Sequence, residues 1–255
     1  MLFDSHAHYD DERFDEDRDE LLMGMKDNNV GYIMNSCSSI SDIPKIFELA
    51  EKYPFIYLSV GIHPHEVTGT TEKDMDILKK ACENPKVKAI GEIGLDYYYD
   101  NSPRDLQKKW FARQIELAEE MSLPIAIHDR DAHGDTMDIL RSFDMKSIGG
   151  EFHCFAGSRE MAREVLDMGM YIAFGGSLTF KKSIRPKEVA AYVPLDRILI
   201  ETDCPYLTPE PNRGKRNNSA YMKYVVQMLA DIKGISPEVV EAATEENAKK
   251  CFKIM

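Results

Sequence analysis

Two histidines, His6 and His8, stand two residues apart directly after the apolar pair Leu2 and Phe3. Residues i and i+2 of a β-strand project from the same face, so both imidazoles would point the same way if residues 2–8 form a strand. Two imidazoles in that arrangement could hold one cation. The same residues could equally be surface or capped histidines, and the pair alone does not separate the two interpretations.

The elements that must position these histidines follow from the rest of the chain. Eight runs are typical of strands: 2–8, 31–37, 55–63, 87–96, 124–130, 147–155, 170–178 and 197–205. Segments with helical apolar spacing lie between them, most clearly at 103–122, where Pro103 stands at the start. Strands that alternate with helices pair in parallel, so the pattern predicts a (β/α)8 TIM barrel, an α/β fold that forms a single domain over residues 1–255. A doubly wound open sheet is the alternative, but the sequence has neither GxGxxG after the first strand nor GxxxxGK[ST].

A barrel enzyme builds its site at the carboxyl ends of its strands. Four imidazoles and two carboxylates fall at or near predicted strand ends: His6, His8, Glu92, His128, His153 and Asp203. Neutral histidine nitrogen and carboxylate oxygen are the usual ligands of catalytic divalent metals, and six candidates favour two ions over one. The alternative is a polar cluster held together by hydrogen bonds alone. His63 also ends a predicted strand, and as a bare residue it could be a hydrogen-bonded histidine without a function.

Composition limits the class of protein. A chain of 255 residues that is 43% hydrophobic and 30% charged can bury a sizeable core. No apolar run approaches the roughly 20 residues of a membrane span, and the first residues do not have the pattern of a signal peptide. The five cysteines are widely spaced without a CxxC motif, which indicates reduced thiols, and we expect Cys154 and Cys204 to face the helical layer. We therefore expect a cytoplasmic protein that does not bind membranes and has no obligate protein partner.

The charge pattern bears on the substrate. A net charge of −12 argues against a broad basic surface for duplex DNA, but basic residues follow several predicted strands. They are Arg130 after the fifth strand, Lys181, Lys182 and Arg185 after the seventh, and Arg213, Lys215 and Arg216 after the eighth. This arrangement favours an anionic substrate. The tyrosines at 97–99 could stack an unpaired base or could simply pack the loop.

Over nearly its whole length the sequence resembles the TatD-like metal-dependent hydrolase and deoxyribonuclease family of the amidohydrolase-like superfamily. The motifs that carry the resemblance are DSHAHYD, VGIHPHE, AIGEIGLDYY, PIAIHDRDA, FHCFAGS, ILIETDCPYLTP, RGKRNNSAYM and EENAKKCF. One local departure is Asn218-Ser219, where the family more often has Glu-Pro.

The resemblance implies two divalent metal ions per chain, which could be Mg²⁺, Zn²⁺ or Mn²⁺. One ion would be held by His6, His8 and Asp203 and the other by His128 and His153, with Glu92 bridging the two. Such a centre activates water for attack on phosphorus or carbonyl carbon. Asp203 and Glu92 are the expected catalytic residues, and Asp203 would also accept the proton of the water.

The resemblance also suggests the substrate. His63 is expected to touch a substrate phosphate, and the sequence adds Arg130, Arg213, Lys215 and Arg216 as substrate-binding candidates. Glu201 shares a face with Asp203 and could orient a metal ligand or form a structural ion pair. The leading hypothesis is a deoxyribonuclease acting on single-stranded DNA or another phosphodiester. The alternatives are an esterase, lactonase or deacylase of the same superfamily, or a metal-binding protein without catalysis.

Overall fold

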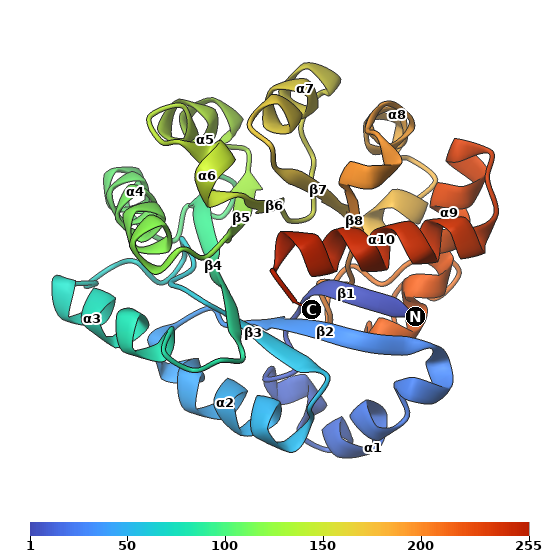
Figure 1. The fold of residues 1–255 in the computed structure, drawn as a ribbon, viewed down its shortest axis with the longest axis horizontal. Coiled ribbons are helices and arrows are strands. Elements are labelled where there is room, and N and C mark those ends of the chain that lie inside the picture. Colours follow the sequence, from blue (N-terminus) through green and yellow to red (C-terminus); the bar gives the residue numbers. More distant parts are fainter. Residues whose placement is uncertain (255) are drawn as a thin grey trace.

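The computed structural model describes residues 1–254, so Met255, the last residue of the expected domain, lies outside the described residues. Eight parallel strands run in the order of the chain around a barrel, with the helices outside them (Figure 1). The strands are β1 (Leu2–Ala7), β2 (Val30–Ser36), β3 (Ile56–Val60), β4 (Val87–Asp96), β5 (Ile125–Arg130), β6 (Gly150–Phe152), β7 (Tyr171–Phe174) and β8 (Ile198–Ile200). The predicted (β/α)8 barrel is confirmed.

The helices cover the strands with one apolar face each. They are α1 (Arg18–Met23), α2 (Ile43–Lys52), α3 (Glu72–Ala81), α4 (Arg104–Met121), α5 (His133–Leu140), α6 (Met145–Ile148), α7 (Arg159–Asp167), α8 (Ile184–Tyr192), α9 (Met222–Lys233) and α10 (Pro237–Cys251). Several of these helices begin at residues that favour a helix amino-terminus. Thr71 and Asp74 form a capping box at α3, and Pro237 opens α10. None of the helices within residues 1–254 is long and apolar enough to cross a membrane.

The two ends of the barrel interior differ in chemistry. At the amino-terminal ends of the strands, Phe3, Met34 and Leu199 form an apolar cluster with Phe252 and other residues at the carboxyl end of the chain. Buried polar side chains fill the opposite end. Because the apolar cluster closes the amino-terminal end, the carboxyl ends of the strands form the open end of the barrel.

Hydrogen bonds between the end of β1 and the segment that follows β8 close the barrel. The amide of His8 donates to the carbonyl of Cys204 at 2.9 Å, and the amide of Asp203 donates to the carbonyl of His6 at 2.9 Å. Below this seam the buried carboxylate of Asp4 accepts from the Thr202 hydroxyl at 2.7 Å and from the Ser219 hydroxyl at 2.6 Å. Ser219, which is part of the departure from the family motif, therefore helps to close the barrel.

Four strands are clearly shorter than the sequence predicted. The run 55–63 gives β3 only over Ile56–Val60, so His63 lies in the loop that follows. The run 147–155 begins inside α6 and gives a strand only over 150–152; Gly149, with a φ of 74°, ends α6, and Cys154, with a φ of 44°, lies beyond the strand. The run 170–178 gives β7 and then a 3-10 turn at Gly176–Thr179. The run 197–205 ends its strand at Ile200. Turns follow β6 and β7, whereas β8 ends where the polar residues Glu201, Thr202 and Asp203 begin.

The early end of β6 changes the expectation for one cysteine. Cys204 is fully buried and belongs to the apolar core, as expected. Cys154 is only partly buried, because its left-handed backbone removes it from the alternation of a strand. The expectation that it faces the helical layer was therefore based on a strand that does not reach it.

Gly94 permits the close approach of β4 and β5 beside the polar cluster. Its φ is +146°, and an added Cβ would lie 1.9 Å from the carbonyl oxygen of His128. A side chain cannot be accommodated at this separation, so glycine is required here. The close approach sets the distance between Glu92 on one strand and His128 on the other.

Candidate metal centre

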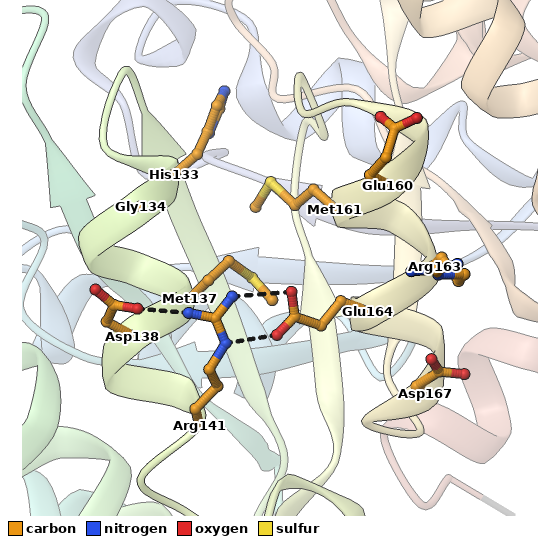
Figure 2. A pocket seen from close by; sticks show the side chains of 10 residues that line it. All are labelled: His133, Gly134, Met137, Asp138, Arg141, Glu160, Met161, Arg163, Glu164 and Asp167. Atoms are coloured by element: carbon orange, nitrogen blue, oxygen red, sulfur yellow. Dashed lines mark hydrogen bonds and ion pairs between the residues drawn. The ribbon is translucent and has the colours of Figure 1, made fainter.

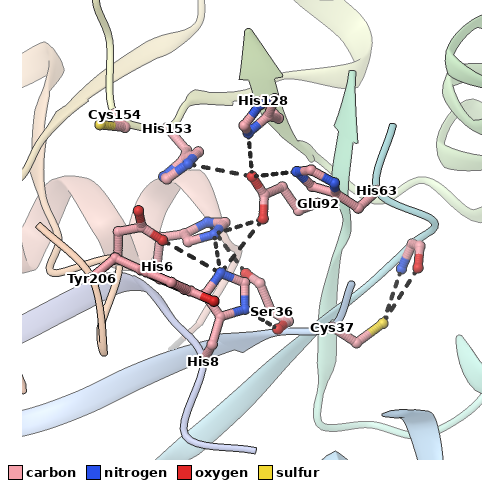
Figure 3. Close-up of polar contacts among 12 residues, drawn as sticks. His6, His8, Ser36, Cys37, His63, Glu92, His128, His153, Cys154 and Tyr206 are labelled. Carbon is pink, nitrogen blue, oxygen red and sulfur yellow. Dashed lines mark hydrogen bonds and ion pairs between the residues drawn. The ribbon is translucent and has the colours of Figure 1, made fainter. Parts of the chain in front are cut away.

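Glu92, near the carboxyl end of β4, lies at the centre of a ring of imidazoles (Figure 3). Its Oε1 is 2.7 Å from Nδ1 of His128 and 3.4 Å from Nε2 of His153. Its Oε2 is 3.2 Å from Nε2 of His6 and 3.5 Å from Nε2 of His8. Asp203 joins the cluster through Oδ1, which lies 3.5 Å from Nε2 of His8. The structure thus brings together all six side chains that the sequence singled out as ligand candidates.

Three groups within this cluster place one possible ligand atom from each member within 4.8 Å of the others. The groups are His6–His8–Asp203, His6–Glu92–His153 and His63–Glu92–His128. The first group is the set expected for one ion. His128 and His153, expected to share the other ion, occur in two different groups, and both of these groups contain Glu92. The carboxylate of Glu92 therefore stands between two regions that can receive a cation.

Hydrogen bonds orient the rings of His8, His153 and His128. Their directions show whether the rings can bind a metal. His8 donates from Nδ1 to the carbonyl of Ser36 at 2.8 Å. His153 donates from Nδ1 to Glu201 Oε2 at 3.0 Å. In a neutral ring with one nitrogen protonated, the other carries a lone pair, and here that nitrogen faces Glu92. Rings oriented in this way have the donor chemistry that a divalent ion requires.

His128 also donates outward from one ring nitrogen and directs the other toward Glu92, but the roles of Nδ1 and Nε2 are exchanged. Its Nε2 donates to Asp96 Oδ2 at 3.0 Å, so Nδ1 is the atom that faces Glu92. Asp96 also accepts from Nε2 of His65 at 2.9 Å. Burial disfavours the charge of Asp96, but its bonds with His128 and with the Tyr99 amide outweigh burial and lower its pKa. Asp96 therefore stays ionised and holds two imidazoles in place.

His63 has the opposite arrangement. Its Nδ1 accepts a hydrogen bond from the backbone amide of His65 at 3.2 Å, so the neutral ring carries its proton on Nε2. That Nε2 lies 3.6 Å from Glu92 Oε1. Burial holds the pKa of His63 well below its usual value, so the ring is neutral. His63 thus presents an N–H, not a lone pair, to the interior of the site.

The charges of the carboxylates and rings are strongly coupled. Burial disfavours ionised Glu92, but the surrounding histidines outweigh burial and hold its pKa well below the usual range. Burial would also lower the pKa of His8, whereas Asp203 and Glu92 raise it to about 9. Asp203 has a lowered pKa because its bond to His8 and the nearby imidazoles outweigh its burial. Both carboxylates are therefore ionised near neutral pH.

The cluster opens into a cavity of about 630 Å³ at the carboxyl ends of the strands. His63 and Arg130, two of the expected substrate contacts, line it together with Tyr99 and Tyr206. Arg213, Lys215 and Arg216 are not among its lining residues within the described part of the chain. The guanidinium of Arg213 lies 4.0 Å from the ring centroid of Phe180, and that of Arg216 pairs with Asp17 at 2.5 Å.

A second hollow, of about 410 Å³, lies on the outer surface between α5 and α7 (Figure 2). Arg141 crosses it and binds Glu164 through two bonds of 2.6 and 3.0 Å. Of the seven histidines only His133 lines it, and His133 bonds to Asp129 at 2.7 Å. Glu92 and Asp203, the expected catalytic residues, line the cavity at the carboxyl ends of the strands and not this hollow.

Sequence reasoning gave no role to Asp96 or His65. Asp96 could have been found by the period of a strand, because it lies four residues after Glu92 in β4. His65 lies in the loop after β3, where no such period applies. For Glu201, by contrast, the sequence suggests either that it orients a metal ligand or that it forms a structural ion pair. It accepts from both the His153 ring and the Cys154 amide, at 3.0 and 2.9 Å.

An open barrel end with a ring of imidazoles around ionised carboxylates defines a metal-dependent hydrolase. Comparison with known proteins assigns the family: the TatD related DNase model matches residues 3–253, and the chain belongs to that family. It is 46% identical over 254 residues to the "uncharacterized metal-dependent hydrolase YabD" of Bacillus subtilis, with 100% of both chains covered. It is 30% identical over 260 residues to the "3'-5' ssDNA/RNA exonuclease TatD" of Salmonella typhimurium, again with 100% of both covered.

The fold agrees with this family. The crystal structure of YJJV, a TatD homologue from Escherichia coli, superposes with a TM-score of 0.93 at 27% sequence identity. The match covers 100% of this chain and 98% of the other.

Proposed function

We propose that the protein hydrolyses phosphodiester bonds of single-stranded nucleic acid, with two divalent ions held at the cluster around Glu92. The observation that carries this proposal is the position of Glu92 between two groups of donors, with a different oxygen toward each. His6, His8 and Asp203 would hold one ion. His128 and His153 would hold the other, and Glu92 would contact both. The name of the Salmonella relative and the lining of the cavity support nucleic acid as the substrate.

Bound divalent ions would supply an activated water and stabilise developing negative charge on the substrate. The protein supplies the remaining functions. Asp203 is ionised and lines the cavity, so its carboxylate can accept a proton from the water that attacks. His63 can donate its Nε2 proton in a hydrogen bond to a phosphate oxygen, and Arg130 adds positive charge at the rim.

The experiment that tests the function compares wild type with Glu92→Ala on two kinds of substrate. Both proteins are incubated with end-labelled single-stranded DNA and with a panel of p-nitrophenyl esters. We expect wild type to cleave the DNA and Glu92→Ala to be inactive. Efficient cleavage of a neutral ester with no cleavage of DNA would assign the protein to the esterases, lactonases or deacylases instead. Metal binding without activity on any substrate would indicate a non-catalytic metal protein.

We further propose a cytoplasmic location for the protein. Its five cysteines are all free, as expected in a reducing compartment. Fractionation of cells that produce the protein, followed by immunoblotting, tests this, and recovery in a secreted or periplasmic fraction would contradict it.

A further inference from the structure

Two stacks of tyrosine and arginine border the cavity. The first is built on the loop after β8, where Tyr206 lines the cavity and is 47% exposed. The guanidinium carbon of Arg13 lies 4.1 Å from the ring centroid of Tyr206. Asp11 holds that guanidinium through two bonds, from Nε at 2.9 Å and from Nη2 at 2.7 Å. The charge of Arg13 is thus largely balanced, and Arg13, which does not line the cavity, supports the Tyr206 ring.

The second stack follows β4 and β5. Tyr98 and Tyr99 are 59% and 54% exposed, and the guanidinium carbon of Arg130 lies 4.3 and 4.9 Å from their ring centroids. Tyr99 and Arg130 line the cavity. Unlike Arg13, Arg130 makes its contacts with these aromatic rings and forms no ion pair within residues 1–254. This rim therefore combines flat aromatic surface with uncompensated positive charge.

The two stacks lie on opposite sides of the donor cluster. The strands follow the order of the chain around the barrel, so the loops after β4 and β5 face the loop after β8 across its mouth. One hydrogen bond fixes each stack to the cluster: the Tyr206 amide donates to the carbonyl of Asp203, at 2.9 Å. The Tyr99 amide donates to Asp96 Oδ1 at 2.8 Å, and the other oxygen of Asp96 holds His128.

We propose that each stack receives one of the two nucleobases that flank the cleaved phosphate. This inference rests on the proposed function. A base stacks on Tyr206 on one side of the cluster and another stacks against Tyr99 and Arg130 on the other side, with the phosphodiester between them. Both bases must be unpaired and splayed apart to reach opposite rims, so the geometry selects single strands over duplexes. Stacking is tolerant of base identity, so we expect little sequence preference.

The test pairs enzyme variants with substrates that lack one base. Wild type, Tyr206→Ala, Tyr99→Ala and the conservative Phe variants are assayed on short single-stranded oligonucleotides, intact or with one abasic nucleotide on either side of the cleaved bond. Each Ala variant should raise KM for the intact strand by roughly fivefold or more, and each Phe variant should stay near wild type. The abasic nucleotide at the matching position should raise KM for wild type equally and cause no further increase for the Ala variant.

Tyr192→Ala is the matched control, because Tyr192 carries a similar arginine stack, with Arg159 at 4.4 Å, but does not line the cavity. Its KM should equal that of wild type. If the losses from the Ala variant and the abasic nucleotide multiply, or if Tyr206→Ala and Tyr99→Ala bind the intact strand as wild type does, the stacking proposal is wrong. Failure of the proposed function has a different signature, since wild type would then cleave none of the strands.

Discussion

Individual hydrogen bonds decide what each histidine of the cluster can do. In their neutral forms His8 and His153 donate outward from Nδ1 and direct the lone pair of Nε2 toward Glu92, whereas His63 accepts from the His65 amide and presents a proton. Residue type and spacing predicted the cluster itself, because histidines two apart or at strand ends share one face. The sequence could not predict which nitrogen faces inward, since that depends on partners such as Asp96 that come from other strands or loops.

Asp203 offers a direct test of the proposed proton acceptor. Asp203→Asn keeps the size of the side chain and removes most of its basicity, so we expect turnover to fall by about 10²-fold or more. Binding of single-stranded DNA and its dependence on salt should remain, because Arg130, the basic residue that lines the cavity, is unchanged. Turnover, equilibrium binding and metal content are measured on the same preparations. Turnover within about tenfold of wild type would contradict the proton-accepting role.

Asp96 should act through His128 and His65. In Asp96→Asn the amide nitrogen cannot accept from either ring, so His128 loses the bond that orients it, and we expect metal affinity to fall by roughly 10- to 100-fold. Competition with a chelator of known affinity measures this. Asp129→Asn is the control, since Asp129 follows His128 in the chain but bonds to His133. Equal affinities in the two variants would argue against the role of Asp96.

At the scale of strands and helices, apolar periodicity predicted all eight strands, and the bounds of β4 at 87–96 agree fully with the prediction. The errors lie in β3, β6, β7 and β8, where the predicted run extends beyond the strand into a loop or turn. Such runs satisfy the pattern of a buried strand, but backbone angles at residues such as Gly149 and Cys154 end the ladder. The loop contacts could not be predicted either, because stacks such as Arg13 on Tyr206 join segments far apart in the sequence.

Gly94 tests the packing of β4 against β5. Gly94→Ala places a methyl group against the carbonyl of His128, so we expect a loss of more than about 3 kcal/mol in the free energy of unfolding. Urea unfolding followed by circular dichroism measures this. Gly134→Ala is the matched control, because nothing lies within 4 Å of its added Cβ and it stands in α5, where alanine should stabilise by up to about 1 kcal/mol. A Gly94→Ala protein as stable as wild type would refute the packing argument.

At the scale of the whole molecule, a chain of net charge −12 must attract a polyanion through a few local charges. Arg130 is the basic residue that lines the cavity, so Arg130→Ala should weaken binding of single-stranded DNA and flatten the dependence of log K on log salt by about 0.7. Fluorescence anisotropy at several salt concentrations measures the slope. Arg141→Ala removes an equal charge at the outer hollow and should leave the slope unchanged. If both variants gave the same slope, the prediction that Arg130 binds a phosphate would be wrong.

The donor set also predicts the metal. Imidazole-rich ligation favours zinc, manganese or iron over magnesium, so we expect the protein as purified to carry a tightly bound transition metal. Chelation should lower the melting temperature, because ions that bind only the folded chain stabilise it. Elemental analysis and thermal unfolding before and after chelation test both statements. Protein without a transition metal, whose activity returns with magnesium alone, would contradict the prediction.

The closure of the barrel has a consequence for the synthesis of the protein on the ribosome. Asp203, the partner of His6 and His8 across the seam, is synthesised nearly two hundred residues after them. The bonds of Asp4 to Thr202 and Ser219 that hold this seam also await the last quarter of the chain. A growing chain therefore has its first proposed metal ligands long before it has a complete site. We expect the nascent protein to be inert toward nucleic acid, including the messenger from which it is translated, until the final strand closes the barrel.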